Sequence, residues 1–210
     1  MNITVIGAGN MGSAFVKKLY KAGHTITVTS KDMVKAQEVA AAYINVRAAN
    51  ASESALNAEL IILATGYADA DAALQPLGNL AGKVIVDITN PLTADYMGLT
   101  IGHSTSAAEE IAKLVPQAFV VKAFNTVFAS VLGDDTSSIQ GNKVSVFIAG
   151  DSEKAKQTVK QVAASMGFEP VDAGNLKNAR YLEPLAGLNI YFGYGAGLGT
   201  NIAPTWLRKA

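Results

Sequence analysis

The 210-residue chain contains no cysteine and only two histidines, His24 and His103. The absence of cysteine excludes disulfides, thiolate metal sites and cysteine nucleophiles. Two histidines are too few for a multi-histidine metal site, so we expect no bound metal. A chain without cysteine is also typical of a reducing compartment, and we therefore expect a cytoplasmic protein.

Charge is scarce as well. Lysine and arginine number 17, aspartate and glutamate number 17, and only 16% of residues are charged, against about 25% in an average domain. With a net charge of zero the chain lacks the basic surface that nucleic-acid binding requires, so we expect no nucleic-acid partner. A low charge content leaves apolar surface to cover, which favours a homodimer.

The longest uncharged run covers residues 184–207 and is long enough to suggest a membrane span. It contains five glycines, two asparagines and a proline near each end, and these residues break a helix that faces lipid. We interpret the run as a buried helix followed by a glycine-rich tail, and expect no contact with a membrane. The first residues have no basic segment and no cleavage site, so we expect no signal peptide.

Apolar periodicity predicts strands that alternate with helices. Strands are expected at 2–6, 25–29, 44–47, 60–63, 83–87, 118–123, 144–149 and 169–172, and helices at 10–21, 33–43, 106–114 and 152–166. Ser106 and Glu109 form a capping box at one helix start. This order predicts an α/β protein with a doubly wound, mostly parallel sheet, helices on both faces, and a C-terminal helix with its tail. The polar stretch 133–142 is expected to be a mobile loop.

One motif indicates which ligand the sheet binds. Gly7-Ala8-Gly9-Asn10-Met11-Gly12 follows the first strand and opens the first helix. In a Rossmann-type fold the first glycine permits a tight turn, the second lets a pyrophosphate approach the backbone, and the third allows close packing. We therefore expect residues 1–178 to form a dinucleotide-binding domain, with residues 179–210 packed on it. A glycine-rich turn without function is the alternative.

The end of the second strand bears on the choice between NAD and NADP. An NAD site usually places Asp or Glu there, where the carboxylate binds the ribose hydroxyls. This chain has Ser30 and Lys31, with Lys35 on the same side, and these side chains suit a 2′-phosphate. We interpret the neighbouring Asp32 as a helix N-cap. NADPH is therefore the expected cofactor. The alternative is that Lys31 and Lys35 are solvated surface charges with no role in binding.

Further candidates follow later strands, where the ligand crevice of a doubly wound sheet lies. Thr65, Asn90 and Asn125 all come directly after predicted strands. The two asparagines are candidates to hydrogen-bond a carboxamide or a ring carbonyl, although both are also common turn residues. Lys122 could point into the crevice or away from it. We expect Arg180 and Glu183, three residues apart on a helix, to pair with each other.

The sequence resembles NADP oxidoreductases related to the coenzyme F420-dependent reductases of archaea, and is similar to the cytosolic reductase domain of the six-transmembrane metalloreductases. The resemblance covers nearly the whole chain. It rests on residues 7–12, on Ser30, Lys31 and Lys35, on Asn90-Pro91, on 122–126, on 149–151, on 171–174 with Leu176, and on 179–184.

The resemblance implies hydride transfer between NADPH and a flat flavin-like or deazaflavin ring. It implies that Ala8, Gly9, Asn10 and Met11 hold the diphosphate and that Ser30, Lys31 and Lys35 hold the 2′-phosphate. It also places Thr65 and Tyr67 along the ribose and nicotinamide, and Ala123 against the nicotinamide. The chain departs from the archaeal pattern at Asp32, where those enzymes carry arginine, and at Asn125, where they carry histidine. The metalloreductases share the asparagine.

We therefore expect an enzyme: an NADPH-dependent oxidoreductase that exchanges hydride with a small planar acceptor, Asn125 helping to position the reactants. A dehydrogenase of a small hydroxy or imino acid is the first alternative; it would need a proton donor, for which Lys122 is the one lysine near the crevice. His103 is a weaker candidate for a general acid. A non-catalytic NADP sensor is the second alternative. The aromatic, glycine-rich tail is expected to form one wall of the acceptor pocket and a dimer contact.

Overall fold

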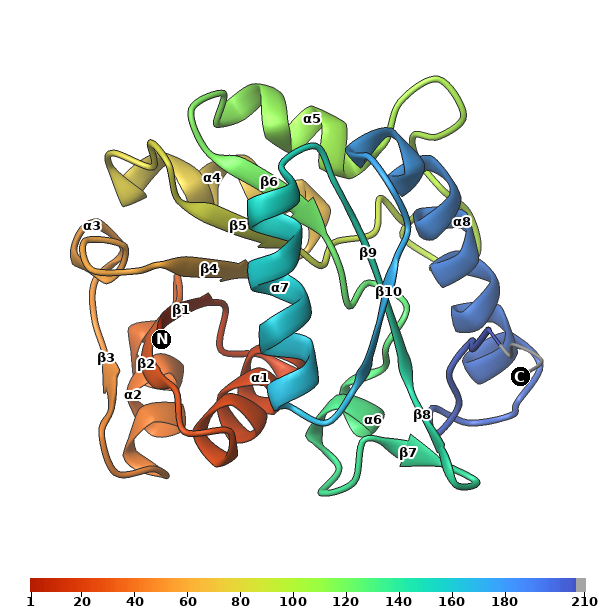
Figure 1. The fold of residues 1–210 in the computed structure, drawn as a ribbon, viewed down its shortest axis with the longest axis horizontal. Coiled ribbons are helices and arrows are strands. Elements are labelled where there is room, and N and C mark those ends of the chain that lie inside the picture. The colour runs from red at the N-terminus through yellow and green to blue at the C-terminus, as the bar shows by residue number, and fades with distance from the viewer. Residues whose placement is uncertain (207–210) are drawn as a thin grey trace.

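The structure is a computed structural model that describes residues 1–206, and at its centre lies a sheet of eight strands (Figure 1). The strands coincide with short apolar, β-branched runs, which pack well on a pleated surface. Their bounds are β1 Asn2–Ile6, β2 Thr25–Thr29, β3 Val46–Ala48, β4 Leu60–Leu63, β5 Val84–Asp87, β6 Phe119–Lys122, β9 Ser145–Gly150 and β10 Glu169–Asp172.

The strands lie in the order β10-β9-β6-β5-β4-β1-β2-β3. Every neighbouring pair is parallel except β6 with β9. The prediction of a doubly wound, mostly parallel sheet is thus confirmed. The chain order reverses between β1 and β4, which pair directly with each other. Such a reversal opens a crevice at the carboxyl ends of the strands, and this is where a ligand is expected.

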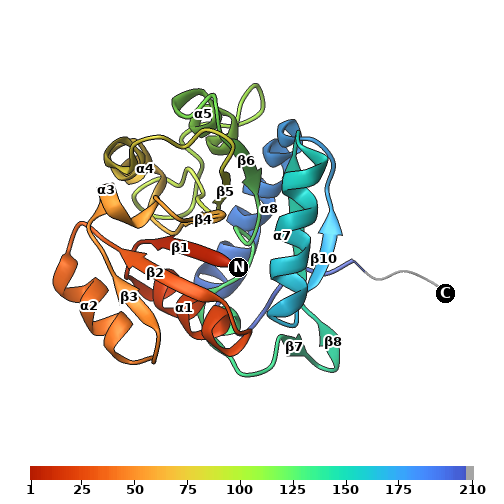
Figure 2. The same ribbon diagram turned by 60° about the vertical axis from the view of Figure 1, so that its left-hand side comes forward.

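Helices cover both faces of the sheet, with α7 on one side and α8 on the other (Figure 2). Alternate strand residues enter separate cores, so Ile62 packs on one face and Ile61 on the other. The first face carries α1 Asn10–Lys21, α2 Met33–Ala41, α6 Ala129–Gly133 and α7 Glu153–Ser165, and the second carries α3 Ala51–Ser54, α4 Ala70–Leu74 and α5 Ala107–Leu114.

Two helix starts have the caps that the sequence predicts. The Ser106 hydroxyl accepts a hydrogen bond from the Glu109 amide at 3.2 Å and donates one to the Glu109 carboxylate at 2.7 Å. Asp32 is the N-cap of α2, and its carboxylate accepts from the Lys35 amide at 3.4 Å. Asp32 therefore has a structural role at the start of this helix.

Two other predictions are corrected. The stretch 133–142, expected to be a loop, contains part of a small hairpin of β7 Ser138–Ile139 and β8 Asn142–Lys143, which extends from the sheet at the bottom of Figures 1 and 2. Gln140 and Gly141, with φ angles of 50° and 80°, form its turn. The strand expected at 44–47 starts at Val46, because Asn45 has a φ of 66° and turns the chain before it.

The last described helix lies on the second face. Helix α8 covers Ala179–Ile190 and continues into a π-helical turn, η4, at Tyr191–Gly195. The tail then lies along the molecule: the Ser130 hydroxyl donates to the Thr200 carbonyl at 2.7 Å, and the Trp206 ring packs edge-on against Phe147. The last four residues of the predicted 179–210 segment lie outside the described residues. Within residues 1–206, no helix has both the length and the apolar character needed to cross a bilayer.

Candidate functional site

A cavity of about 460 Å³ opens where the strand order reverses. Its walls come from the ends of three neighbouring strands, β2, β1 and β4, and from the chain that follows each. After β1 the wall is formed by Gly7, Ala8 and Gly9, and after β4 by residues 64–66. At β2 it is formed by the last strand residue, Thr29, and by residues 30–32 and Lys35, which follow the strand. The far wall is formed by Ala72, Ala73 and Pro76. The fold therefore brings together seven of the predicted site residues, namely Gly7, Ala8, Gly9, Ser30, Lys31, Lys35 and Thr65.

The three glycines of the loop meet different surroundings. A Cβ on Gly7, whose φ is 111°, would lie 2.3 Å from the Ala64 carbonyl oxygen, and a Cβ on Gly12 would lie 1.8 Å from the Gly7 carbonyl oxygen. A Cβ on Gly9 would have nothing within 4 Å. Gly7 and Gly12 are thus required by the packing of the loop, whereas the space at Gly9 is open to a ligand.

Helix α1 begins directly after Gly9, which lines the cavity. Gly9 is its N-cap and provides no side-chain hydrogen bond, and no acidic residue lies in the first turn. The free N–H groups and the positive end of the helix dipole are suited to a pyrophosphate. Asn10 and Met11 lie in this turn but do not line the cavity; Met11 packs against the core.

The end of β2 forms a corner with two positive and two negative side chains. The Lys31 ammonium lies 3.4 Å from the Asp69 carboxylate, and the Lys35 ammonium lies 3.5 Å from the Asp32 carboxylate. All four residues line the cavity, together with Ser30. Asp69 comes from the 3₁₀ turn η1 Tyr67–Asp69. It lies 38 residues from Lys31 along the chain, so no local sequence pattern links the two residues.

Buried polar atoms without hydrogen-bond partners lie just after β4, β5 and β6. The side-chain oxygens of Thr65, Thr89, Thr126 and Asn125 Oδ1 make no hydrogen bond within the described residues. A buried polar atom without a partner is costly, and a ligand with matching groups would remove that cost. Thr89 and Thr126 lie directly beside Asn90 and Asn125 in the sequence.

Asn90 and Asn125 are joined across β5 and β6. The Asn125 side-chain amide donates to Asn90 Oδ1 at 3.0 Å and to the Leu182 carbonyl at 2.9 Å, and the Asn90 amide donates to the Asn125 carbonyl at 2.9 Å. Neither side chain bonds its own backbone, as an isolated turn residue would. Asn125 thus keeps its carbonyl oxygen free while its two N–H groups are fixed.

Phe124 explains how Asn125 reaches this position. Its φ is 60°, which is uncommon for a bulky residue, and its ring is held edge-on between Phe15 and Phe168. Ala123, predicted to touch the nicotinamide, is fully buried with its methyl group in the core. Tyr67 is half-buried, and burial together with the charge of Glu110 raises the pKa of its hydroxyl. Neither Ala123 nor Tyr67 lines the cavity.

Lys122 points away from the crevice into a buried ionic cluster. Its ammonium lies 2.6 Å from Asp87 Oδ2 and 2.8 Å from Glu183 Oε1, and donates to the Thr89 carbonyl at 2.7 Å. Glu183 also accepts from the Ala107 and Ala108 amides at the start of α5. Lys122 is fully buried, and its ammonium is paired with these protein groups rather than open to the crevice.

The expected pair of Arg180 and Glu183 is wrong. Arg180 instead forms a two-pronged pair with Glu109 on α5, at 2.8 and 2.7 Å, and the Arg180 guanidinium lowers the pKa of the Glu109 carboxyl. Glu183 lies on the buried side of α8 and is taken by Lys122. Helical spacing alone could not show that each residue has a better partner on another element.

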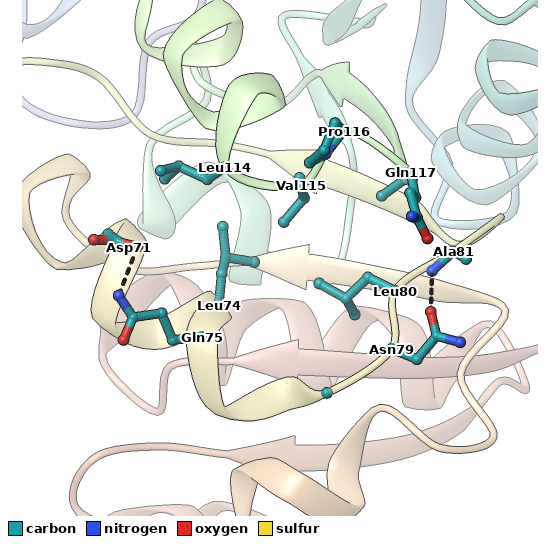
Figure 3. A pocket seen from close by; sticks show the side chains of 12 residues that line it. Asp71, Leu74, Gln75, Asn79, Leu80, Ala81, Leu114, Val115, Pro116 and Gln117 are labelled. Carbon is teal, nitrogen blue, oxygen red and sulfur yellow. Dashed lines mark hydrogen bonds between the residues drawn. The ribbon is translucent and has the colours of Figure 1, made fainter.

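Two further cavities lie elsewhere. One of about 510 Å³ is lined by His103, Lys177, Asn178, Arg180, Tyr181 and Pro184. Another of about 280 Å³ lies before β5 and β6, at the amino ends of these strands (Figure 3). In it Asp71 is bound to Gln75 at 3.1 Å, and Asn79 to the Ala81 amide. Neither cavity shares a lining residue with the one at the strand reversal.

A doubly wound sheet with a glycine loop at the strand reversal defines a dinucleotide-binding protein. Residues 2–91 match the family described as NADP oxidoreductase, coenzyme F420-dependent. A crystal structure of a proposed F420-dependent NADP reductase from Arthrobacter sp. FB24 is similar over 98% of this chain and 99% of that one, with a TM-score of 0.88 and 31% identity. The chain belongs to this family of NADP-dependent oxidoreductases.

Two curated relatives are metalloreductases. STEAP3 of Rattus norvegicus is 30% identical over 87% of this chain, and STEAP2 of Homo sapiens is 28% identical over 88% of it. The chain spans only 36% of the length of each of these proteins.

Proposed function

We propose that the cavity holds NADPH and that the chain transfers its hydride to a flavin-like or deazaflavin acceptor. The observation that carries the proposal is a row of buried polar atoms without partners, which starts at Thr65 on the cavity wall and continues outside the cavity lining at Thr89, Thr126 and Asn125. It continues from the glycine loop along the carboxyl ends of β4, β5 and β6. A dinucleotide that extends from the loop across these ends would give each atom a partner.

The roles of the residues follow from their positions. The free amides of the first turn of α1, around Gly9, bind the diphosphate, and Ser30, Lys31 and Lys35 take the 2′-phosphate. Asn125 Oδ1 accepts from the nicotinamide carboxamide and fixes the plane of the ring. NADPH, when bound, supplies the hydride. The chain's own contribution is to hold the two rings together, for which no acid–base pair is needed.

The alternative of a hydroxy- or imino-acid dehydrogenase is weakened by Lys122. Such an enzyme needs a proton donor at the nicotinamide, and the lysine nearest to it is fully buried between two carboxylates.

The acceptor class is tested by stopped-flow oxidation of NADPH bound to the intact protein. The acceptors are FMN, a deazaflavin, a quinone and a ferric chelate, each at the same concentration. We expect the flavin or deazaflavin to react at least tenfold faster than the other two, because the chelate has no ring to stack on the nicotinamide and the quinone is smaller than the fused three-ring system that the site is proposed to position. Fastest reduction of the chelate or quinone would contradict the proposed acceptor. Tight NADPH binding without any oxidation would identify the protein as a sensor.

A further inference from the structure

The corner at the end of β2, where the 2′-phosphate is proposed to bind, carries as many negative as positive side chains. Lys31 and Lys35 supply two ammonium groups, and Asp69 and Asp32 supply two carboxylates, all on the wall of one cavity. A site that binds a phosphate of nearly two negative charges is expected to be positive. Here each lysine has a carboxylate within 3.5 Å.

The two carboxylates differ in what else they do. Asp32 caps α2, so its position is required by the helix. Asp69 precedes α4 but makes no capping hydrogen bond there, and its one polar contact among the described side chains is with Lys31. Because the pair is exposed, it contributes little to the stability of the fold. Nothing in the local structure therefore requires a carboxylate at position 69.

We propose that Asp69 sets the cofactor specificity of this site by limiting the preference for NADPH over NADH. Its carboxylate repels the 2′-phosphate and competes with it for Lys31. NADH brings no such phosphate and does not meet this repulsion. The chain thus accepts both cofactors, with NADPH bound more tightly by a smaller factor than the two lysines alone would give. This inference rests on the proposed binding of NADPH in the cavity.

The test is calorimetric titration of the intact protein with NADPH and with NADH. We expect Asp69→Asn to raise the NADPH-to-NADH affinity ratio about fivefold, the scale of repulsion between a carboxylate and a phosphate several ångströms apart in water. The gain should shrink as salt is raised, because salt screens exposed charges. A ratio that stays the same or falls would overturn the inference.

Asp71→Asn is the matched control. Asp71 lies two residues away, lines the separate cavity in Figure 3 and bonds Gln75, so its replacement should leave the ratio unchanged. Equal effects of the two variants would show that net charge, rather than the position of Asp69, is responsible, and would also overturn the inference.

Lys31→Ala separates this inference from the proposed function. Loss of its ammonium should weaken NADPH about tenfold and leave NADH nearly unchanged. If Lys31→Ala has this effect and Asp69→Asn has none, only the role of Asp69 is wrong. If Lys31→Ala weakens neither cofactor, the 2′-phosphate is bound elsewhere and the proposed site itself is wrong.

Discussion

Gly9 and Gly12 belong to one loop, but an added methyl group would meet different surroundings at each. At Gly12 the methyl carbon would lie 1.8 Å from the Gly7 carbonyl oxygen, which is backbone and cannot turn aside. At Gly9 it would meet nothing within 4 Å. The same residue type thus serves the fold at one position and leaves room for a ligand at the other.

This contrast predicts two different outcomes. Gly12→Ala should destabilise the protein by about 2 kcal/mol, because the loop must move away from α1. Gly9→Ala should leave the melting temperature unchanged but weaken NADPH at least tenfold, since its methyl group occupies the approach of the diphosphate. Thermal unfolding and cofactor titration of both variants check this. An undiminished affinity in Gly9→Ala would mean that the diphosphate does not approach the loop there.

The role of a single residue can be predicted from the sequence only where it depends on residues close by along the chain. The glycine loop and the Asp32 cap were predictable because each depends on a few neighbouring residues. Asp69 was not, since only the fold brings the chain after β4 beside the end of β2. The free carbonyl of Asn125 also depends on distant partners, Asn90 and Leu182.

At the scale of elements, β1, β2, β4 and the edge strand β10 were predicted with the bounds that the structure has, whereas β5, β6 and β9 differ from the prediction by one residue at one or both ends. β1, β2 and β4 begin and end where the apolar runs do, because burial on both faces leaves little choice of residue. The hairpin of β7 and β8 was missed because each strand has two residues and no apolar pattern. α3, α4 and α6 are likewise only four or five residues long, too short to show helical periodicity.

The Glu183 carboxylate connects elements that no sequence pattern links. It connects α8 to Lys122 on β6 and to the first amides of α5, while Lys122 also holds Asp87 at the end of β5. The cluster lies directly behind Thr89 and Ala123, at the strand ends where the nicotinamide is proposed to lie. It therefore fixes the backbone of that region.

We expect Glu183→Ala to destabilise the protein by about 3–5 kcal/mol, because it leaves a buried ammonium with one counter-ion and two amides without an acceptor. Glu153→Ala is the control: the Glu153 side chain is exposed, and Lys156 and Lys160 both keep Asp172 as a partner, so its loss should cost under about 1 kcal/mol. Denaturant unfolding of both variants measures the difference. Similar values for the two would mean that the buried cluster does not hold these elements together.

At the scale of the molecule, apolar side chains remain uncovered on the last helical turns. Leu188, Tyr191, Phe192, Tyr194 and Leu198 are all exposed and follow one another along α8, η4 and the tail. We call these five residues the tail surface. Tyr194 packs edge-on against Phe128, which follows Asn125 by three residues, so the tail surface adjoins the ends of the central strands. Several exposed apolar side chains on one short segment are typical of a contact site.

We predict that a second copy of the chain covers the tail surface and that the resulting homodimer closes the acceptor pocket. Sedimentation at micromolar concentration should then give twice the 21.8 kDa chain mass. Leu198→Glu, at a side chain that is 63% exposed, should give monomers that still bind NADPH but reduce flavins at least tenfold more slowly.

Ile44→Glu is the matched control, because Ile44 is 75% exposed but lies in the turn before β3, outside the tail surface. It should remain dimeric and fully active. A monomeric wild-type protein would show that no second copy covers the tail surface. Monomeric Leu198→Glu with an unchanged rate of flavin reduction would separate the two roles: the tail surface would be a dimer contact only, and the acceptor would stack on the strand ends without help from a partner.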